Sequence, residues 1–565
     1  MPWSHIYDPL GSPALSTLVA LLPLLVLLGL LAAAGWPAWR AAVAGLTAAL
    51  GIAVGVVGMP ASAAAAAAVH GAAFGLFPIG WIVVAAMFLH ALCVEAGALE
   101  VMKRSVTGLS ADHRLQALLI GFSFGAFLEG AAGFGAPVAI SAALLAATGL
   151  PAFEAACLAL LANTAPVAFG ALGTPIITLA RVSGLDEQAI SALAGRQLPF
   201  FSLIVPAWMV AVLAGWRGLV GVWPAVLVCG ATFAIVQFAM ANFVGAALVD
   251  VVGGTASLVA LAVFLAMWRP RQIWRHPDAA PQAQPTTRDP VRTVAWAWAP
   301  WAFLSLAVFL WGLPAVRAAL EGRSAVAGKI VLPAATVAPE FPVPFLDGRV
   351  AKVPPATRES REIERAVYRF NWLSAAGTGI LAAALVSIPW LGIPWRRAWT
   401  LWWENLRRLA APLVTIAAML ALAFVTRYSG TDVTLGLALT RTGSLYPFFA
   451  PLLGWLGVAL TGSDTSSNAM FGSLQRITAE QLGIDPLLAC TANSTGGVMG
   501  KMIDAQSIVV AAAATGDHGQ EGRILRRVFP HSLALAALMG LLVWLQAGPL
   551  DWMVPHTPPP AGDVP

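Results

Sequence analysis

The stretch GFSFGAFLEGAAGFGAP at residues 121–137 and the stretch TGSDTSSNAMFG at residues 461–472 decide how this chain must fold. Each places glycine, small polar residues and an acid inside sequence that is otherwise apolar enough for a membrane helix. Backbone that is not helical at membrane depth has N–H and C=O groups that hydrocarbon cannot satisfy, so protein or a water-filled cavity must surround it. Interrupted helices of this kind build binding sites within membranes. The two stretches therefore indicate a polar site inside a membrane protein.

The composition also places the chain in a membrane. Hydrophobic residues make up 59% of its 565 residues and charged residues only 10%, and the mean hydropathy is +0.79. A soluble globular chain of this length does not have these values. Apolar runs long enough to cross a bilayer recur along the chain and, with the interrupted segments, predict about 12 to 14 crossings. The predicted fold class is an all-α polytopic membrane protein.

The distribution of Lys and Arg predicts the orientation, because these residues concentrate in cytoplasmic loops. The net charge of +5 comes from arginines in short loops between apolar runs, which argues against a nucleic-acid partner. The loops around Lys103, Arg271, Arg396 and Arg523 are predicted to be cytoplasmic. Both chain ends lack Lys and Arg and are predicted to be external. The four cysteines lie singly in apolar sequence without the spacing of metal ligands.

The chain is predicted to consist of two transmembrane halves joined by a polar linker. Within its external loop, the segment Glu321 to Glu364 is rich in Pro, Ala and charge, a composition that favours little regular structure. The predicted units are an N-terminal half (1–268) with a hairpin region (115–181), a cytoplasmic linker (269–295), a C-terminal half (296–548) with an external loop (314–369) and a second repeat (441–516), and an external tail (549–565).

The two interrupted regions resemble each other weakly and run in opposite directions through the membrane. Asn163-Thr164 aligns with Asn493-Ser494-Thr495, and a second break follows each Asn, at Thr174-Pro175 and at Asp504-Ala505. Similar segments of opposite polarity predict inverted-topology repeats, each with a broken helix, whose shared interface near the bilayer midplane is the usual substrate site. The alternative is chance similarity between helices rich in alanine and glycine.

At these residues the sequence resembles the lactate permease family, the proton-coupled bacterial carriers of lactate and glycolate. The resemblance covers nearly the whole chain and rests on Glu129 to Pro137, Asn163-Thr164, and the region from Gly462 to Asp504. It implies a secondary active transporter of the bacterial inner membrane that takes up L-lactate, D-lactate or glycolate with protons and needs no cofactor. More distantly, the Asn-containing pairs resemble signatures of the ion transporter superfamily. That likeness implies two re-entrant hairpins in a transport domain, beside a scaffold that can form a homodimer.

A 2-hydroxymonocarboxylate presents one negative charge and one hydroxyl group. The positive end of a half-helix, where backbone N–H groups lack intrahelical partners, favours the carboxylate. The candidate substrate-binding residues are Gly133, Gly135, Asn163, Thr164, Ser463, Ser466, Asn468, Asn493, Ser494, Thr495 and Lys501. Each also has a structural reading: the asparagines can satisfy broken backbone, and the two glycines can serve close helix packing.

Glu129 is the first candidate for proton coupling, because a charged carboxylate inside a membrane is costly and is readily neutralised by a proton. Asp464 and Asp504 are further candidates. Lys501 and Asp504 are three positions apart, so on a helix they share a face and can form an ion pair. Glu129 can instead cap a helix or pair with Lys501, and Asp464 can cap the helix that follows it.

Two other functions compete with this prediction. One is a carrier of a dicarboxylate or another small organic anion, coupled to sodium or protons. The other is a membrane hydrolase that uses Glu129, Asp464 or Ser463. The sequence has no further candidate base, metal-ligand spacing or nucleotide-binding loop that supports an enzyme. We therefore expect no enzymatic activity.

Overall fold

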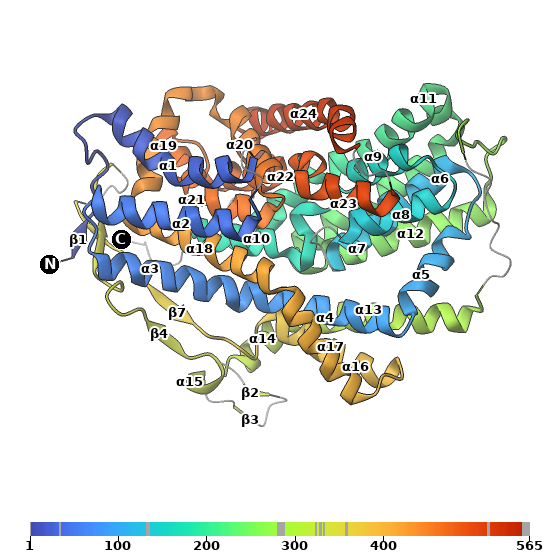
Figure 1. Ribbon diagram of the computed structural model, residues 1–565, viewed down its shortest axis with the longest axis horizontal. Coiled ribbons are helices and arrows are strands. Elements are labelled where there is room, and N and C mark those ends of the chain that lie inside the picture. Colours follow the sequence, from blue (N-terminus) through green and yellow to red (C-terminus); the bar gives the residue numbers. More distant parts are fainter. Residues whose placement is uncertain are drawn as a thin grey trace.

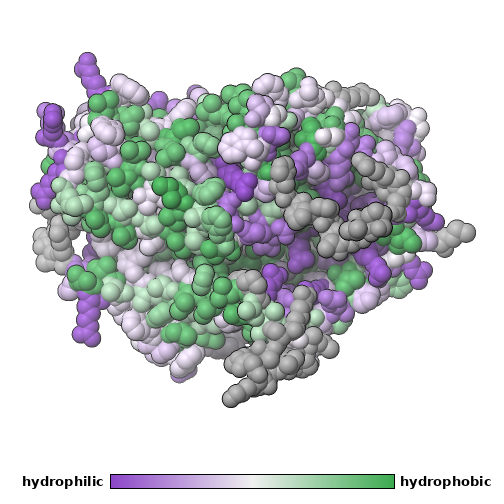
Figure 2. All heavy atoms as spheres, turned by 180° about the vertical axis from the view of Figure 1, so that it is seen from behind, coloured by the Kyte–Doolittle hydropathy of each residue, from purple (hydrophilic) through white to green (hydrophobic). Residues whose placement is uncertain are grey.

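The computed structural model describes residues 2–32, 36–131, 136–279, 289–322, 325–326, 330–331, 334–355, 360–516 and 520–555. These residues are predominantly α-helical (Figure 1). Six of the described helices are long and apolar enough to cross a membrane, and a pair bent by 65°, Ala152–Ala162 with Val167–Ser183, would make a seventh. Hydrophobic side chains cover broad areas of the surface (Figure 2). The predicted class, an all-α multi-pass membrane protein, is confirmed, while the figure of 12 to 14 crossings stays a prediction.

The elements have the following bounds. Before the linker they are β1 (Trp3–Ser4), α1 (Pro13–Ala32), α2 (Ala38–Gly55), α3 (Ala61–Phe74), η1 (Gly75–Gly80), α4 (Trp81–Glu95), α5 (Ala98–Thr107), α6 (His113–Gln116), η2 (Ala117–Phe124), α7 (Gly125–Ala131), α8 (Ala136–Ala147), α9 (Ala152–Ala162), η3 (Val167–Phe169), α10 (Gly170–Ser183), α11 (Glu187–Phe243), η4 (Ala246–Leu248) and α12 (Val249–Met267).

After the linker they are α13 (Val291–Gly312), α14 (Pro314–Leu320), β2 (Ala325–Val326), β3 (Ile330–Val331), α15 (Ala334–Val337), β4 (Glu340–Pro342), β5 (Val350–Lys352), β6 (Glu362–Ile363), β7 (Val367–Arg369), α16 (Ala376–Trp390), α17 (Trp395–Arg408), α18 (Ala410–Ser429), α19 (Thr431–Leu439), η5 (Thr440–Leu445), α20 (Tyr446–Thr461), α21 (Asp464–Leu482), α22 (Pro486–Gly500), η6 (Lys501–Ile503), α23 (Ala505–Thr515), α24 (Glu521–Gln546) and η7 (Asp551–Met553).

The long element α11 is two helices that fold back on each other. Gly215 has φ 66°, in the left-handed region that favours glycine, and ends the first arm. The arms lie antiparallel, since Ser202 Oγ donates to Gln237 Oε1 over 2.7 Å and Ser191 Oγ donates to the carbonyl of Ala241 over 3.0 Å. The apolar runs 198–215 and 219–241 had predicted two crossings here.

The second interrupted stretch forms a helical hairpin. Gly462, with φ 71°, ends α20 in a left-handed conformation, and Ser463 then begins α21. The Ser463 hydroxyl accepts a hydrogen bond from the backbone N–H of Ser466 over 3.2 Å, as an N-cap side chain does. Because Ser463 is the cap, Asp464 is free for other contacts. The first interrupted stretch runs from the end of η2 through α7 to the start of α8, and its Gly133 and Gly135 fall outside the described residues.

The segment predicted to have little regular structure, Glu321 to Glu364, contains short strands in its described parts. The strand β5 pairs with β6 and also with β1 near the N-terminus, and β4 pairs with β7. Glu364 lies between Lys352 Nζ, at 2.7 Å, and Arg427 Nε, at 3.6 Å. Burial disfavours the charged form of Glu364, but the two cations hold its pKa below the usual range. Composition missed this order because the contacts come from the distant N-terminus and α18.

Segments predicted to share one side of the membrane contact each other. Arg104 pairs with Asp289 at the start of α13, and Arg397 on α17 pairs with Glu95 at the end of α4. At the other end, the His5 ring bonds the carbonyl of Tyr428 over 3.1 Å. These contacts bring together the segments that the charge pattern assigns to the same side of the membrane. Which of the two sides is external stays a prediction.

Small residues let α20 and α22 pack with their backbones close together. A Cβ built on Gly496 would collide with the Pro451 carbonyl, and one on Gly500 would collide with the Trp455 carbonyl. Membrane helices approach this closely through residues spaced as Gly496 and Gly500 are. The packing matters because α22 carries Asn493, Ser494 and Thr495.

We predict that Gly496→Val lowers the stability of the folded protein by about 1 to 3 kcal/mol or more, because backbone carbonyls cannot move away as a flexible side chain can. Thermal unfolding of the purified protein in detergent measures the effect. Gly51→Ala is the control, since a Cβ there meets nothing within 4 Å. Equal unfolding temperatures for the two variants would contradict the packing described.

Candidate functional site

The interrupted regions of the two halves meet in the interior of the protein. Thr174 Oγ1, at the restart of regular helix in α10, lies 3.5 Å from Thr465 Oγ1 at the start of α21. Asn468 Nδ2 of α21 donates to the carbonyl of Pro175 over 3.1 Å. In the same way α23, which follows the second break, packs against α8 and α9. Segments some 290 residues apart thus form one buried polar region.

Asp464, through its Oδ2, and Asn468 are the centre of a hydrogen-bond network between α21 and α22. Ser494 Oγ donates to Asp464 Oδ2 over 2.5 Å, and Asn468 Nδ2 lies 3.1 Å from Ser494 Oγ and 3.3 Å from Asp464 Oδ2. Asn493 Nδ2 donates to Asn468 Oδ1 over 2.9 Å. Asn493 therefore bonds a side chain here, whereas the structural alternative to substrate binding had it satisfy broken backbone.

Glutamines that the sequence reasoning did not select complete this network. Gln475 Nε2 donates to Asn493 Oδ1 over 3.1 Å. Thr495 Oγ1 donates to Gln197 Oε1 over 2.7 Å and so links α22 to α11. Both glutamines are completely buried. A polar residue in an apolar helix is the signal that would have found them, because such a residue needs a partner inside the protein.

Lys501 connects the second break to the tip of the second hairpin. Its Nζ donates to the carbonyl of Gly462 over 2.6 Å and lies 3.2 Å from Asp504 Oδ2. Asp504 Oδ1 in turn accepts from the backbone N–H of Ser507 over 2.7 Å, so Asp504 caps α23. The predicted pair of Lys501 and Asp504 is present, with η6 rather than α-helix between them.

Glu129 lies at the end of α7 and is 4% exposed. The charged groups that act on it are Lys501 and Asp504, and Asn163 lies beside it. Gly170 leaves the space for its carboxylate, since a Cβ built there would lie 2.6 Å from Glu129 Oε1. Within the described part of the chain, Glu129 Oε2, both amide atoms of Asn163 and the hydroxyl of Thr164 have no hydrogen-bond partner.

The backbone between α9 and the regular part of α10 is strained beside Glu129. Ala171, Leu172 and Gly173 have successive φ values of 44°, 58° and 76°. A side chain in this left-handed region costs on the order of 1 to 3 kcal/mol, and such strain persists mainly at functional sites. The predicted break at Thr174-Pro175 is where this strained segment ends.

Asp250, in the first turn of α12, is a buried acid that the sequence reasoning did not select. It is 0% exposed, and Glu129 is the charged group that acts on it. Neither of its oxygens has a hydrogen-bond partner among the described residues. Its position directly before an apolar run made it look like the polar end of a helix.

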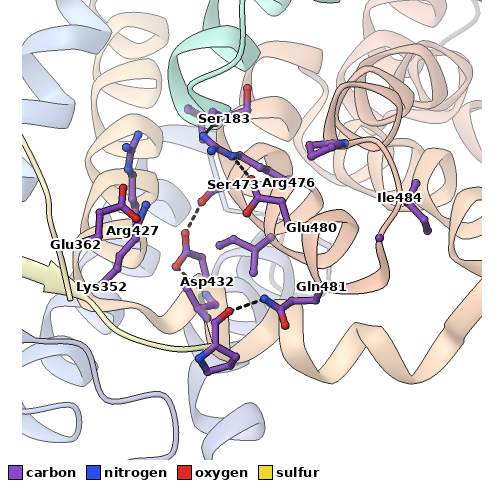
Figure 3. Close-up of a pocket in the computed structure, with 16 residues that line it drawn as sticks. Ser183, Lys352, Glu362, Arg427, Asp432, Ser473, Arg476, Glu480, Gln481 and Ile484 are labelled. Atoms are coloured by element: carbon purple, nitrogen blue, oxygen red, sulfur yellow. Dashed lines mark hydrogen bonds and ion pairs between the residues drawn. The ribbon is translucent and has the colours of Figure 1, made fainter. Parts of the chain in front are cut away.

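The hollow shown in Figure 3 is a separate cavity of about 490 Å³, between α21 and the strand segment. Several of its charged side chains already have partners. Arg476 Nε pairs with Glu480 at 2.7 Å, Arg476 donates to the carbonyl of Ser183, and Ser473 donates to Asp432. The unpartnered polar atoms around Glu129 lie elsewhere, so this cavity is not the candidate site.

Several known proteins are similar to this chain. The family model described as L-lactate permease matches residues 16–548. The chain is 45% identical to the L-lactate permease of Salmonella typhimurium, over 98% of this chain and 100% of that protein. It is 44% identical to the glycolate permease GlcA of Escherichia coli, over 96% of this chain and 98% of that protein. Among solved structures, the YdaH transporter of Alcanivorax borkumensis matches with a TM-score of 0.42 and 14% identity, over 86% of this chain and 88% of that one.

We predict that two buried asparagines differ in their importance for stability. Asn468→Ala removes bonds to Pro175, Ser494 and Asn493 and leaves buried polar groups without partners, which costs about 1 to 3 kcal/mol for each such group. Asn163→Ala removes no well-formed hydrogen bond and should lower the unfolding temperature far less. Thermal unfolding of the two variants in the same detergent measures this. A larger loss for Asn163→Ala would refute the division into a bonded network and an open site.

Proposed function

Because this chain belongs to the L-lactate permease family and is therefore a multi-pass transporter, we propose that it takes up L-lactate and related 2-hydroxymonocarboxylates with protons. D-lactate and glycolate are included among these substrates. The setting proposed is the bacterial inner membrane, with both termini outside and a homodimer as the assembled form. The family resemblance and the charge pattern support these points.

The observation that carries the proposal is the group of unpartnered polar atoms around Glu129, on which the buried cation Lys501 acts. Asn163 and Thr164 have amide and hydroxyl groups without partners among the described residues, next to Glu129. Buried polar groups are rarely left unbonded in folded proteins, so a bound molecule is a natural partner for them. A 2-hydroxymonocarboxylate offers a hydroxyl and a carboxylate, which match an amide, a hydroxyl and an ammonium group.

Lys501 is the group proposed to receive the substrate carboxylate. Its ammonium now bonds the Gly462 carbonyl and Asp504, both at the meeting point of the hairpin tip and the second break. The start of α21, with the candidate residues Ser463 and Ser466, lies at the same tip, where helix geometry favours an anion. In this structure the N–H groups of Ser463 and Ser466 bond Thr461 Oγ1 and Ser463 Oγ. The bonded residues Asn468, Asn493, Ser494 and Thr495 are proposed to hold these elements in place around the substrate.

Glu129 is proposed to carry the coupled proton, with Asp464 and Asp504 as further acids of the same region. A proton on Glu129 removes a negative charge from the neighbourhood of Lys501, and Lys501 can then attract the anionic substrate more strongly. Loading the proton therefore favours loading the substrate. A carrier without substrate favours release of the proton from Glu129. Because the proton and the substrate each favour binding of the other, their fluxes are coupled.

Inverted repeats are part of the proposal, and the contacts between helices support them. The second arm of the second hairpin, α21, packs against α10, which follows the first break. The matching arm of the first half, α8, packs against α23, which follows the second break. This exchange of contacts is what two units of opposite polarity would make around a shared site.

Uptake of labelled L-lactate into proteoliposomes tests the proposal. An inside-alkaline pH gradient should drive accumulation above equilibrium, and a sodium gradient should not. Accumulation driven only by sodium, or of a dicarboxylate in place of lactate, would support a different carrier. Absence of uptake together with hydrolysis of lipid or peptide would support an enzyme.

We predict that Glu129→Gln abolishes accumulation driven by the pH gradient and keeps exchange of external for internal lactate. Gln retains the shape of the side chain but cannot release a proton. Glu154→Gln, in the first turn of α9, is the matched control and should accumulate lactate normally. Normal accumulation in Glu129→Gln would remove Glu129 from the coupling role.

A further inference from the structure

Asp250 is a buried acid for which the proposed mechanism so far has no use. It is 0% exposed in the first turn of α12, where an acid commonly caps backbone N–H groups. Here both of its oxygens lack a hydrogen-bond partner among the described residues, so it does not serve as a cap. A carboxyl group without partners is costly to bury, and a structural role does not explain it.

Glu129 and Asp250 lie side by side where α7 crosses α12. Gly130, the residue after Glu129, packs directly on Asp250: a Cβ built on Gly130 would lie 2.7 Å from Asp250 Cβ and 2.7 Å from the N–H nitrogen of Val251. The elements packed against α12 include α7, α10 and α11. Of the charged groups that the described parts of these elements carry, Glu129 is the one that acts on Asp250.

Two neighbouring carboxyl groups in a buried site cannot both be ionised at moderate cost. Of these two acids only Glu129 has a cation that acts on it, Lys501, and Lys501 already has Asp504 as an ion-pair partner. The protonation state with the lowest electrostatic free energy has one proton shared between Glu129 and Asp250. Protons bound in this way belong to the pair and not to either residue alone.

We propose that Asp250 is a second proton-binding residue, and that Glu129 and Asp250 together form the unit that carries the coupled proton. This inference rests on the proposed function. The empty carrier holds one proton on the pair. A second proton from the external water binds as the lactate anion binds near Lys501, and it leaves to the cytoplasm with the lactate. Only O–H bonds form and break, and one proton and one anion move together.

The test uses the full-length protein in proteoliposomes with three variants. Asp250→Asn removes the second acid, Asp250→Glu keeps it, and Asp432→Asn is the control, because Asp432 is also a buried acid but bonds Ser473 and lines the separate cavity. We expect Asp250→Asn to accumulate lactate at least about tenfold less under a pH gradient, while exchange continues. We expect Asp250→Glu to recover much of the accumulation and Asp432→Asn to match the unchanged protein.

The pH profile of exchange separates coupling from a packing defect. In the unchanged protein the second proton leaves a pair that still holds one proton, and this shared proton stabilises the remaining charge. Asp250→Asn lacks the shared proton, so the ionised form of Glu129 is less favoured and the profile should move toward alkaline pH by about one unit. Full accumulation with an unchanged profile in Asp250→Asn would overturn the inference and leave the proposed function intact. Failure of the unchanged protein to accumulate lactate would instead overturn the proposed function.

If Asp250→Asn also loses lactate exchange, infrared spectroscopy tests the shared proton directly. The unchanged protein at neutral pH should show the C=O stretching band of a protonated carboxyl group. This band should be lost or displaced in Asp250→Asn and in Glu129→Gln, and it should persist in Asp432→Asn. A band that is unaltered in Asp250→Asn would overturn the shared-proton pair.

Discussion

The requirement that polar groups inside a membrane find partners within the protein organises this structure. Most of the buried polar residues near the two breaks meet it: Asp464, Asn468, Asn493 and Ser494 bond one another across α21 and α22. Glu129, Asn163 and Asp250 do not meet it within the described part of the chain. The same requirement therefore divides the polar residues into a bonded framework and an open group. Function is proposed for the open group because its members lack the contacts that a structural role provides.

The backbone is shaped to bring these groups together. Gly170 leaves room for the Glu129 carboxylate, and Gly130 lets α7 lie directly on α12 at Asp250. The strained residues Ala171 and Leu172 keep the break open next to the acid. On the opposite side, Lys501 is fixed by the hairpin tip and by Asp504. A proton and an anion can thus bind close to each other in one buried region, which coupling between them requires.

The sequence predicted the fold class, the interrupted stretches and the spacing of Lys501 and Asp504, because each is a local pattern of hydropathy or helical period. It did not predict that Ser463, and not Asp464, caps α21, since adjacent polar residues are equally good caps until the turn at Gly462 is known. It missed Asp250 and Gln475 because their importance depends on neighbours far away in the chain. It also missed the strands of 321–364, whose partners include the N-terminal β1.

The buried acids are proposed to carry one proton across the membrane together with each substrate anion. The most direct measurement is the internal pH of proteoliposomes, read with a pH-sensitive dye, when L-lactate is added outside with no gradient imposed beforehand. The account predicts that the interior becomes acid as labelled lactate enters, with one proton for each anion. Entry of lactate with no change of internal pH, in vesicles shown to be tight to protons, would contradict it.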